Sequence, residues 1–155
     1  MVEFRPASPV DAESVSILTE YFAQRAAGFP DGTYFPAPPG PTTFQPPDGV
    51  FLLVGPRGAA VGCGGIRRID DGDAGVRFEV KHLFLKPETR GRGWGRALLE
   101  ELERRAREWG AAELVLDTHH TLEAAGALYV RSGYVTIAPY NDNPNATRWY
   151  RKALA

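Results

Sequence analysis

The chain has 155 residues, a formal net charge of −1 and a hydrophobic fraction of 43%. This size and balance are typical of a globular protein, so we expect a single domain over residues 1–155. The nearly neutral charge gives no reason to expect nucleic acid or a membrane surface as a partner. Cys63 is the only cysteine, which excludes an internal disulfide. Together with a start that lacks an apolar run, this favours a cytoplasmic protein.

The first third of the chain predicts a strand, a helix and a long loop. Residues 2–5 read as a short strand, and Ser8 followed by Pro9 and Asp11 predicts the start of a helix that runs to about residue 27. Residues 29–49 are rich in proline, glycine and aromatic side chains. A loop of this length is either functional or mobile, and its aromatic residues argue against a plain linker.

The middle of the chain predicts three strands and a helix. The strands are expected at residues 50–54, 60–69 and 76–85. The helix follows a glycine-rich segment and is expected to run to about Trp109, because Gly110 stops it. Glu103 and Arg107 lie four residues apart and are expected to pair on its solvent-facing side.

The last third predicts a strand, a helix and a closing hairpin. The strand is expected at residues 114–117, the helix at 122–132, and the hairpin strands at 134–140 and 148–154. The glycine-rich segment then lies between a long strand and a helix that packs on the sheet. We therefore expect an α/β fold with a mixed central sheet.

The glycine-rich segment is the most informative part of the chain. Its three glycines alternate with larger residues at the predicted strand-to-helix turn. Such a turn points several main-chain N–H groups, and the positive end of a helix dipole, at one point outside the protein, which suits a phosphate or pyrophosphate. Glycine is needed because a Cβ atom would hold the ligand's oxygens away from the backbone. The segment is Arg90, Gly91, Arg92, Gly93, Trp94, Gly95 and Arg96.

Three well-known kinds of glycine-rich segment fit these residues poorly. The dinucleotide-binding fingerprint needs G-x-G-x-x-G after the first strand of its unit, and the P-loop needs lysine and serine or threonine after its last glycine. An RNA-binding segment rich in arginine and glycine would be disordered and repeated, whereas this one opens a well-patterned helix.

Two motifs together resemble the GNAT superfamily of acyl-CoA-dependent N-acetyltransferases. They are Arg90-x-x-Gly93-x-Gly95 and Ala125-x-x-Leu128-Tyr129-x-x-x-Gly133-Tyr134. They occur in the family's order, and the order of the predicted elements matches over nearly the whole chain. The resemblance implies a mostly antiparallel sheet that splays between two strands and is flanked by helices. It also implies acetyl transfer from acetyl-CoA to a primary amine of a small molecule, by direct attack in a ternary complex.

The resemblance assigns the contacts to coenzyme A. The glycine-rich segment would cradle the pyrophosphate, and unpaired main-chain groups at Leu83, Phe84 and Leu85 would bond the pantetheine arm as an added strand does. A main-chain N–H near Leu83 would meet the oxyanion. Relatives often carry Asn or Gln where this chain has Leu122, so one coenzyme contact is weakened.

The resemblance also assigns an acid and a base. Tyr129 falls on the family's proton donor, and Glu79 lies where one branch of the family carries its base. A phenol with a pKa of ~10 stays protonated beside a thiol of ~8.5, so it can protonate the leaving thiolate. A free glutamate with a pKa of ~4.3 needs burial to act as a base, and binding the amine is an alternative role for Glu79.

Further reactive residues are expected to play lesser parts. His119 and His120 follow a strand near the cleft, where they could relay protons, although such a pair is more often exposed. His82 is expected to face away from the cleft, and Cys63 to be a small buried strand residue. No full set of metal ligands is present, so no metal is expected.

Alternative functions stay open from the sequence. A non-catalytic acyl-CoA-binding module would need the glycine-rich segment but neither Tyr129 nor Glu79, and both are present, which favours an enzyme. A different acyl donor, or a protein amine as acceptor, is a further alternative. In such folds the first helix and the loop at 29–49 build the acceptor wall, and the aromatic residues there suggest an apolar or aromatic element in the acceptor. Pairing of two copies through the last strands would give a homodimer.

Overall fold

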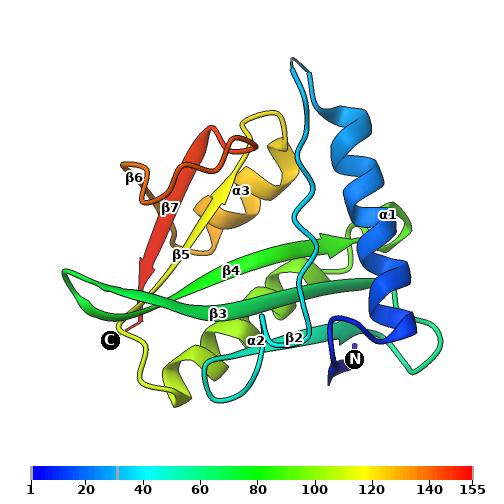
Figure 1. Cartoon of the computed structure of the whole chain (residues 1–155), viewed down its shortest axis with the longest axis horizontal. Coiled ribbons are helices and arrows are strands. Elements are labelled where there is room, and N and C mark those ends of the chain that lie inside the picture. The colour runs from blue at the N-terminus through cyan, green and yellow to red at the C-terminus, as the bar shows by residue number, and fades with distance from the viewer. Residues whose placement is uncertain (1, 31, 155) are drawn as a thin grey trace.

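The computed structural model describes residues 2–30 and 32–154, and it arranges them as one seven-stranded sheet with three α-helices (Figure 1). The strands are β1 (Phe4–Pro6), β2 (Gly49–Val54), β3 (Gly62–Gly72), β4 (Gly75–Leu85), β5 (Glu113–Thr118), β6 (Val135–Ile137) and β7 (Arg148–Ala153). The helices are α1 (Ala12–Gly28), α2 (Trp94–Glu108) and α3 (Glu123–Arg131), and a 3₁₀ turn at Pro87–Thr89 precedes α2. Within the described ranges, each helix is too short or too polar to cross a membrane.

The sheet is mostly antiparallel and splits in its middle. Its strand order is β1-β2-β3-β4-β5-β7-β6, and only β4 and β5 run parallel. These two strands pair only where Arg77–Glu79 meets Glu113–Val115. Beyond Glu79 they diverge, as Figure 1 shows. The expected mixed, mostly antiparallel sheet that splays between two strands is thereby confirmed.

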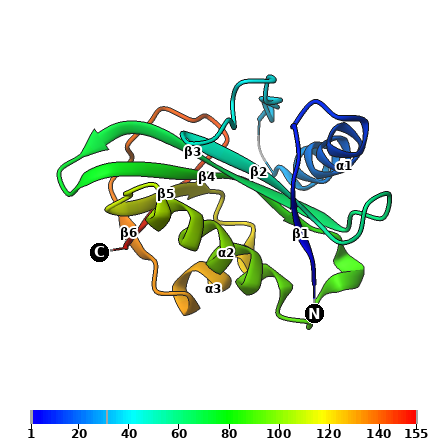
Figure 2. The same cartoon turned by 90° about the horizontal axis from the view of Figure 1, so that it is seen from below.

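Both faces of the sheet are covered by helices. Figure 2 shows α1 on one face and α2 with α3 on the other. Side chains of β2 alternate between the two layers: Val50, Leu52 and Val54 join the core under α2 and α3, whereas Phe51 and Leu53 join the core under α1. Burial on both faces explains why β2 reads as a continuous apolar run.

Several element boundaries differ from the predictions, and β3 covers Gly62–Gly72 where the sequence predicts a strand at residues 60–69. The helix α1 begins after Asp11 and not at Ser8, because the Ser8 carbonyl accepts the N–H of Asp11 at 3.2 Å and forms a turn before the helix. The closing hairpin is confirmed by the antiparallel pairing of β6 and β7. However, β6 ends at Ile137, so the predicted strand residues 138–140 belong to the loop that leads to β7.

The sequence predicts that Glu103 pairs with Arg107 on the solvent side of α2, and this prediction is wrong. Glu103 is buried. Its carboxylate is 2% exposed and accepts hydrogen bonds from the Tyr134 hydroxyl at 2.9 Å and from Lys152 Nζ at 3.0 Å. Arg107 donates instead to the carbonyl of Leu154 at 3.3 Å. These contacts attach α2 to the C-terminal hairpin.

Candidate active site

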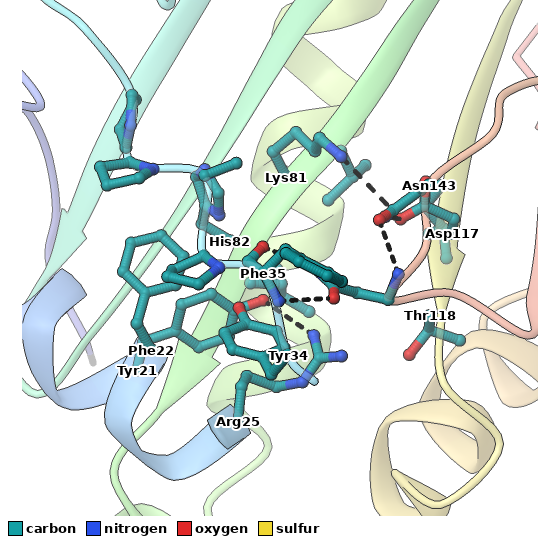
Figure 3. Close-up of a pocket in the computed structure, with 18 of the residues that line it drawn as sticks. Tyr21, Phe22, Arg25, Tyr34, Phe35, Lys81, His82, Asp117, Thr118 and Asn143 are labelled. Carbon is teal, nitrogen blue, oxygen red and sulfur yellow. Dashed lines mark hydrogen bonds and ion pairs between the residues drawn. The ribbon is translucent and has the colours of Figure 1, made fainter. Parts of the chain in front are cut away.

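A cavity of about 570 Å³ opens where β4 and β5 diverge. Figure 3 shows aromatic side chains gathered on one side of it and charged or amide side chains on the other. We call the first side the aromatic wall, formed by Tyr21, Phe22, Tyr34, Phe35, Phe44 and His82. We call the second side the polar wall, formed by Arg67, Lys81, Asp117, Asn141 and Asn143.

A bulge in β4 decides which of its side chains reach the cavity. Two residues of β4, His82 and Leu83, lie opposite one residue of β3, Gly64. His82 has a φ of 57°, in the left-handed region that residues other than glycine rarely adopt. Neighbours in a strand normally point to opposite faces, but here Lys81 and His82 both line the cavity. The expectation that His82 faces away is therefore wrong.

The imidazole of His82 is enclosed by aromatic rings. Its centroid lies 5.8 Å from that of Tyr21, 5.3 Å from that of Phe22 and 6.0 Å from that of Phe44. Burial, with a smaller contribution from the Lys81 charge, lowers the pKa of His82 to about 3. The ring is therefore neutral at neutral pH and adds no charge to the aromatic wall.

The carboxylate of Glu79 is a buried hub behind the polar wall. Glu79 is 2% exposed. Its Oε1 accepts a hydrogen bond from Arg67 Nε at 3.0 Å and forms an ion pair with Arg67 Nη2 at 2.9 Å. Its Oε2 accepts the Tyr140 hydroxyl at 2.7 Å, and Lys81 Nζ lies 3.9 Å from the same oxygen. Glu79 thus fixes side chains that line the cavity, while its own side chain lies outside the lining.

Asp117 on β5 lines the cavity and accepts hydrogen bonds from the loop between β6 and β7. Its Oδ2 accepts Asn141 Nδ2 at 2.7 Å, and its Oδ1 accepts Asn143 Nδ2 at 3.1 Å. Lys81 Nζ lies 3.9 Å from the same Oδ1, so this ammonium sits between two carboxylates. The polar wall therefore ties the two diverging strands together through charge.

Tyr129 on α3 closes the cavity on a third side. The residue is 5% exposed and lines the cavity with Ala125 and Leu122 from the start of the same helix. Burial raises the pKa of the Tyr129 phenol well above its ordinary value, so the hydroxyl is protonated at neutral pH.

The glycine-rich segment ends in the first turn of α2. Gly91 and Gly93 have φ values of 81° and 75°, and a Cβ atom on either would meet open space. Backbone conformation, and not crowding, therefore requires glycine at both positions. The main-chain N–H groups of residues 91–96 donate no hydrogen bond within the described part of the chain, and the first helical bond runs from Ala97 to the Gly93 carbonyl at 3.1 Å.

Most side chains of this segment are turned to solvent or to their neighbours. The Arg92 guanidinium lies 5.0 Å from the centre of the Trp94 ring, and Arg96 pairs with Glu100 at 3.1 Å. Gly95 lets α2 approach α3, since a Cβ there would lie 3.3 Å from Leu128. The groups of this segment that are free to meet an anion are therefore its main-chain N–H groups.

The model of the acetyltransferase (GNAT) family matches residues 15–134, which is most of the chain. The chain belongs to the GNAT family of acetyltransferases. It is 38% identical over 105 residues to the IAA acetyltransferase of Azospirillum brasilense, an alignment that covers 66% of this chain and 67% of that protein. The family membership confirms an acetyltransferase, as the two motifs predicted.

Solved GNAT structures share the whole architecture. A protein of Klebsiella pneumoniae subsp. pneumoniae, classed as an acyl-CoA N-acyltransferase, is 30% identical with a TM-score of 0.75, and the match covers 100% of this chain and 99% of that one. A GNAT acetyltransferase of Elizabethkingia anophelis, crystallised with acetyl-CoA bound, has a TM-score of 0.64 at 13% identity, over 98% and 97% of the two chains.

In this GNAT acetyltransferase the remaining candidate residues lie away from the cavity. His119 is buried, with its ring 5.1 Å from that of Phe29 and its Nδ1 2.7 Å from Thr121 Oγ1. His120 is exposed, so only one of the pair lies at the surface. Cys63 is fully buried, and burial raises the pKa of its thiol, which confirms it as an inert strand residue. No cluster of three metal-ligating side chains occurs over residues 2–30 and 32–154.

The sequence reasoning missed most of the polar wall of this GNAT acetyltransferase. Asn141, Asn143 and Asn145 alternate along the connection between β6 and β7, for which the sequence predicts only the closing hairpin. Their regular spacing was the available signal, because alternate residues of an extended loop can face one side. Which side they face depends on Asp117, which lies more than twenty residues earlier on β5.

The loop at 29–49 is fastened across the cavity by Asn145. The side-chain Nδ2 of Asn145 donates to the Phe35 carbonyl at 2.7 Å, and its Oδ1 accepts the Phe35 N–H at 2.9 Å. Figure 1 shows the loop descending from the end of α1 in front of β4. This pair of bonds, which we call the Asn145 latch, joins the loop to the β6–β7 connection on the other side of the cavity.

Proposed function

We propose that this protein transfers an acetyl group from acetyl-CoA to a primary amine of a small molecule, by direct attack in a ternary complex. The observation that carries the proposal is one continuous cavity that reaches from Tyr129 to the aromatic wall, because donor and acceptor can meet in it. A volume of about 570 Å³ under a latched loop favours a small molecule over a protein segment. The Elizabethkingia anophelis structure with acetyl-CoA supports the same donor here.

We assign coenzyme A to the glycine-rich segment and to the free edge of β4. Within the segment from Arg90 to Arg96, the N–H groups of residues 91–96 are unbonded at the start of a 15-residue helix, which suits the pyrophosphate. Leu83, Phe84 and Leu85 lie on the part of β4 that no longer pairs with β5, so its main chain is open to the pantetheine arm. We assign the N–H of Leu83, within the bulge, to the oxyanion.

We assign Tyr129 as the acid that protonates the leaving thiolate. Its hydroxyl stays protonated through burial, and the residue lines the cavity between the start of α3 and the diverging strands. Among the described residues, Asp117 is the one carboxylate in the cavity lining, so it is the carboxylate that an acceptor amine can approach directly. We assign it to bind the amine.

The variant Glu79→Gln tests whether Glu79 orients its neighbours or acts as the base. A carboxylate that already accepts close hydrogen bonds from Arg67 and Tyr140 is placed to orient its neighbours. We therefore expect the variant to raise the acceptor KM and to lower Tm, with a smaller effect on kcat. Steady-state kinetics from pH 5 to pH 10 and a thermal melt measure these effects. A fall in kcat of about 100-fold with loss of the acidic limb, at unchanged KM and Tm, would instead establish Glu79 as the base.

A panel of primary amines tests the proposed function. Each amine is incubated with acetyl-CoA, free thiol is read with a chromogenic disulfide, and the acetylated product is identified by mass spectrometry. We expect small amines with an aromatic or apolar body to be acetylated, with release of the coenzyme A thiol, because such a body can pack against the aromatic wall. Binding of acetyl-CoA by calorimetry without turnover of any amine would favour the non-catalytic module.

Asn145→Ala removes both bonds of the Asn145 latch. We expect the loop to loosen and the acceptor KM to rise on the order of 10-fold, while the KM for acetyl-CoA is unchanged. Limited proteolysis within residues 32–44 should also become faster. Asp142→Ala, an exposed residue of the same connection, is the control. Equal acceptor KM values in the Asn145 variant and the wild type would show that the latch does not shape the acceptor site.

A further inference from the structure

Arg25 brings an unbalanced positive charge into the cavity. It projects from the last turn of α1, half-buried, with Nη1 3.4 Å from the Tyr21 hydroxyl and its guanidinium carbon 5.2 Å from the centre of the Tyr34 ring. Figure 3 shows it beside these two rings. Burial raises the pKa of Tyr21 to about 12, so that hydroxyl is neutral. Arg25 thus has aromatic neighbours and no acidic partner among residues 2–30 and 32–154.

The remaining charges around the cavity cancel within the protein. Arg67 pairs with the buried Glu79, and Lys81 lies between Glu79 and Asp117. The ring of His82, enclosed by aromatic side chains, is neutral. Among the residues that the structure describes, the positive charge left over therefore belongs to Arg25. A half-buried guanidinium without a counter-charge is costly in an apolar setting, and a bound anion removes that cost.

The phosphates of coenzyme A are not the anion that this position fits. The glycine-rich segment, where we place the pyrophosphate, contributes no residue to the cavity lining. Arg25 lies beside Tyr21 and Tyr34 of the aromatic wall, on the side that α1 and the loop at 29–49 form. A planar guanidinium presents paired donors whose spacing matches the two oxygens of a carboxylate. Its place among aromatic side chains indicates that the carboxylate belongs to a molecule with an apolar body.

We propose that the acceptor amine also carries a carboxylate, which Arg25 binds. This inference rests on the proposed function and names its substrate class: primary amines that bear a carboxylate and an aromatic or apolar group, of the aromatic amino acid type. The apolar group lies against the aromatic wall, the carboxylate meets Arg25, and the amine faces Asp117 on the polar wall. The carboxylate of the acceptor then supplies a negative charge next to Arg25.

The kinetic test compares phenylalanine with phenylalaninamide as acceptors. We expect Arg25→Gln to lower kcat/KM about 10- to 100-fold for the carboxylate and less than about 3-fold for the carboxamide. Each acceptor is compared with itself, so the difference in amine reactivity cancels. Arg25→Lys keeps the charge and should fall between wild type and Arg25→Gln. Arg57→Gln, at an exposed turn between β2 and β3, is the control.

Two kinetic outcomes would overturn the inference. An equal loss for both acceptors would show that Arg25 supports the cavity without reading a carboxylate. A rise in the KM for acetyl-CoA alone would place Arg25 on the coenzyme. Melting temperatures of all variants show whether a loss reflects the fold, and Arg25→Lys serves as the second variant if Arg25→Gln is unstable.

A binding test needs no turnover. Calorimetry measures 3-phenylpropanoate and 3-phenylpropanamide on the wild type and on Arg25→Gln, and we expect the substitution to raise Kd at least about 10-fold for the carboxylate only. If the carboxylate binds through Arg25 but no amine is acetylated, the proposed function fails and the anion site stands. If amines are acetylated while neither measurement depends on Arg25, this inference alone fails.

Discussion

Tyr129→Phe is expected to lower kcat by about 10²- to 10⁴-fold while the affinity for acetyl-CoA stays nearly unchanged. The substitution removes one hydroxyl from a buried ring that lines the cavity, so the thiolate would leave without a proton and the packing would be kept. Steady-state kinetics with a reactive amine give kcat, and calorimetry gives the Kd for acetyl-CoA.

Tyr150→Phe is the matched control for this experiment. Its ring lies 5.8 Å from that of Tyr129 and is equally buried, yet it is not part of the cavity lining. We expect less than about a 2-fold change in kcat there, because the cavity lining stays intact. Because burial raises the pKa of Tyr129, its proton is lost only at high pH, and kcat should show no alkaline fall from this group below about pH 10. Normal turnover in Tyr129→Phe would remove the residue from the mechanism.

Gly93→Val is expected to abolish binding of acetyl-CoA. Gly93 has a φ of 75°, which valine adopts only with strain, and the new side chain would stand in front of the free N–H groups at the start of α2. Both effects act on the main chain that we assign to the pyrophosphate. Calorimetry with coenzyme A measures the loss.

Gly110→Val separates strain from lost binding. Gly110 follows the other end of α2 with a φ of 81°, and a Cβ there also meets open space. The two variants should lose a similar amount of stability, on the order of 1–2 kcal/mol, seen as similar falls in Tm. Only Gly93→Val should lose the coenzyme. Unchanged Kd in Gly93→Val would contradict the assignment of the segment.

The sequence was sufficient for those elements whose signals are local. Gly93 and Gly110 mark both ends of α2, and the apolar spacing of Leu98, Leu102 and Ala106 fixes which face packs on the sheet. The family motifs supplied the splay between β4 and β5, which local patterns do not encode. Tyr129 was found the same way, and the structure places it in the cavity lining.

The rest of the site depends on contacts between distant segments. The bulge that turns His82 into the cavity arises from the register of β4 against β3, which no short pattern determines. Glu103 looked solvated because its helical neighbours are charged, but Tyr134 and Lys152 meet it from the C-terminal hairpin. No sequence pattern marks Arg25, since only the folded chain brings the rings of Tyr21 and Tyr34 next to it.

The Asn145 latch has a consequence for how such enzymes diverge. It joins two connections, the segment after α1 and the one before β7, and neither contributes to the glycine-rich segment or to the open edge of β4. Insertions or substitutions confined to these two connections would therefore change the shape of the proposed acceptor site and leave the segments assigned to coenzyme A unchanged. On the assignments proposed above, part of the acceptor site can therefore change without any change in the segments assigned to coenzyme A.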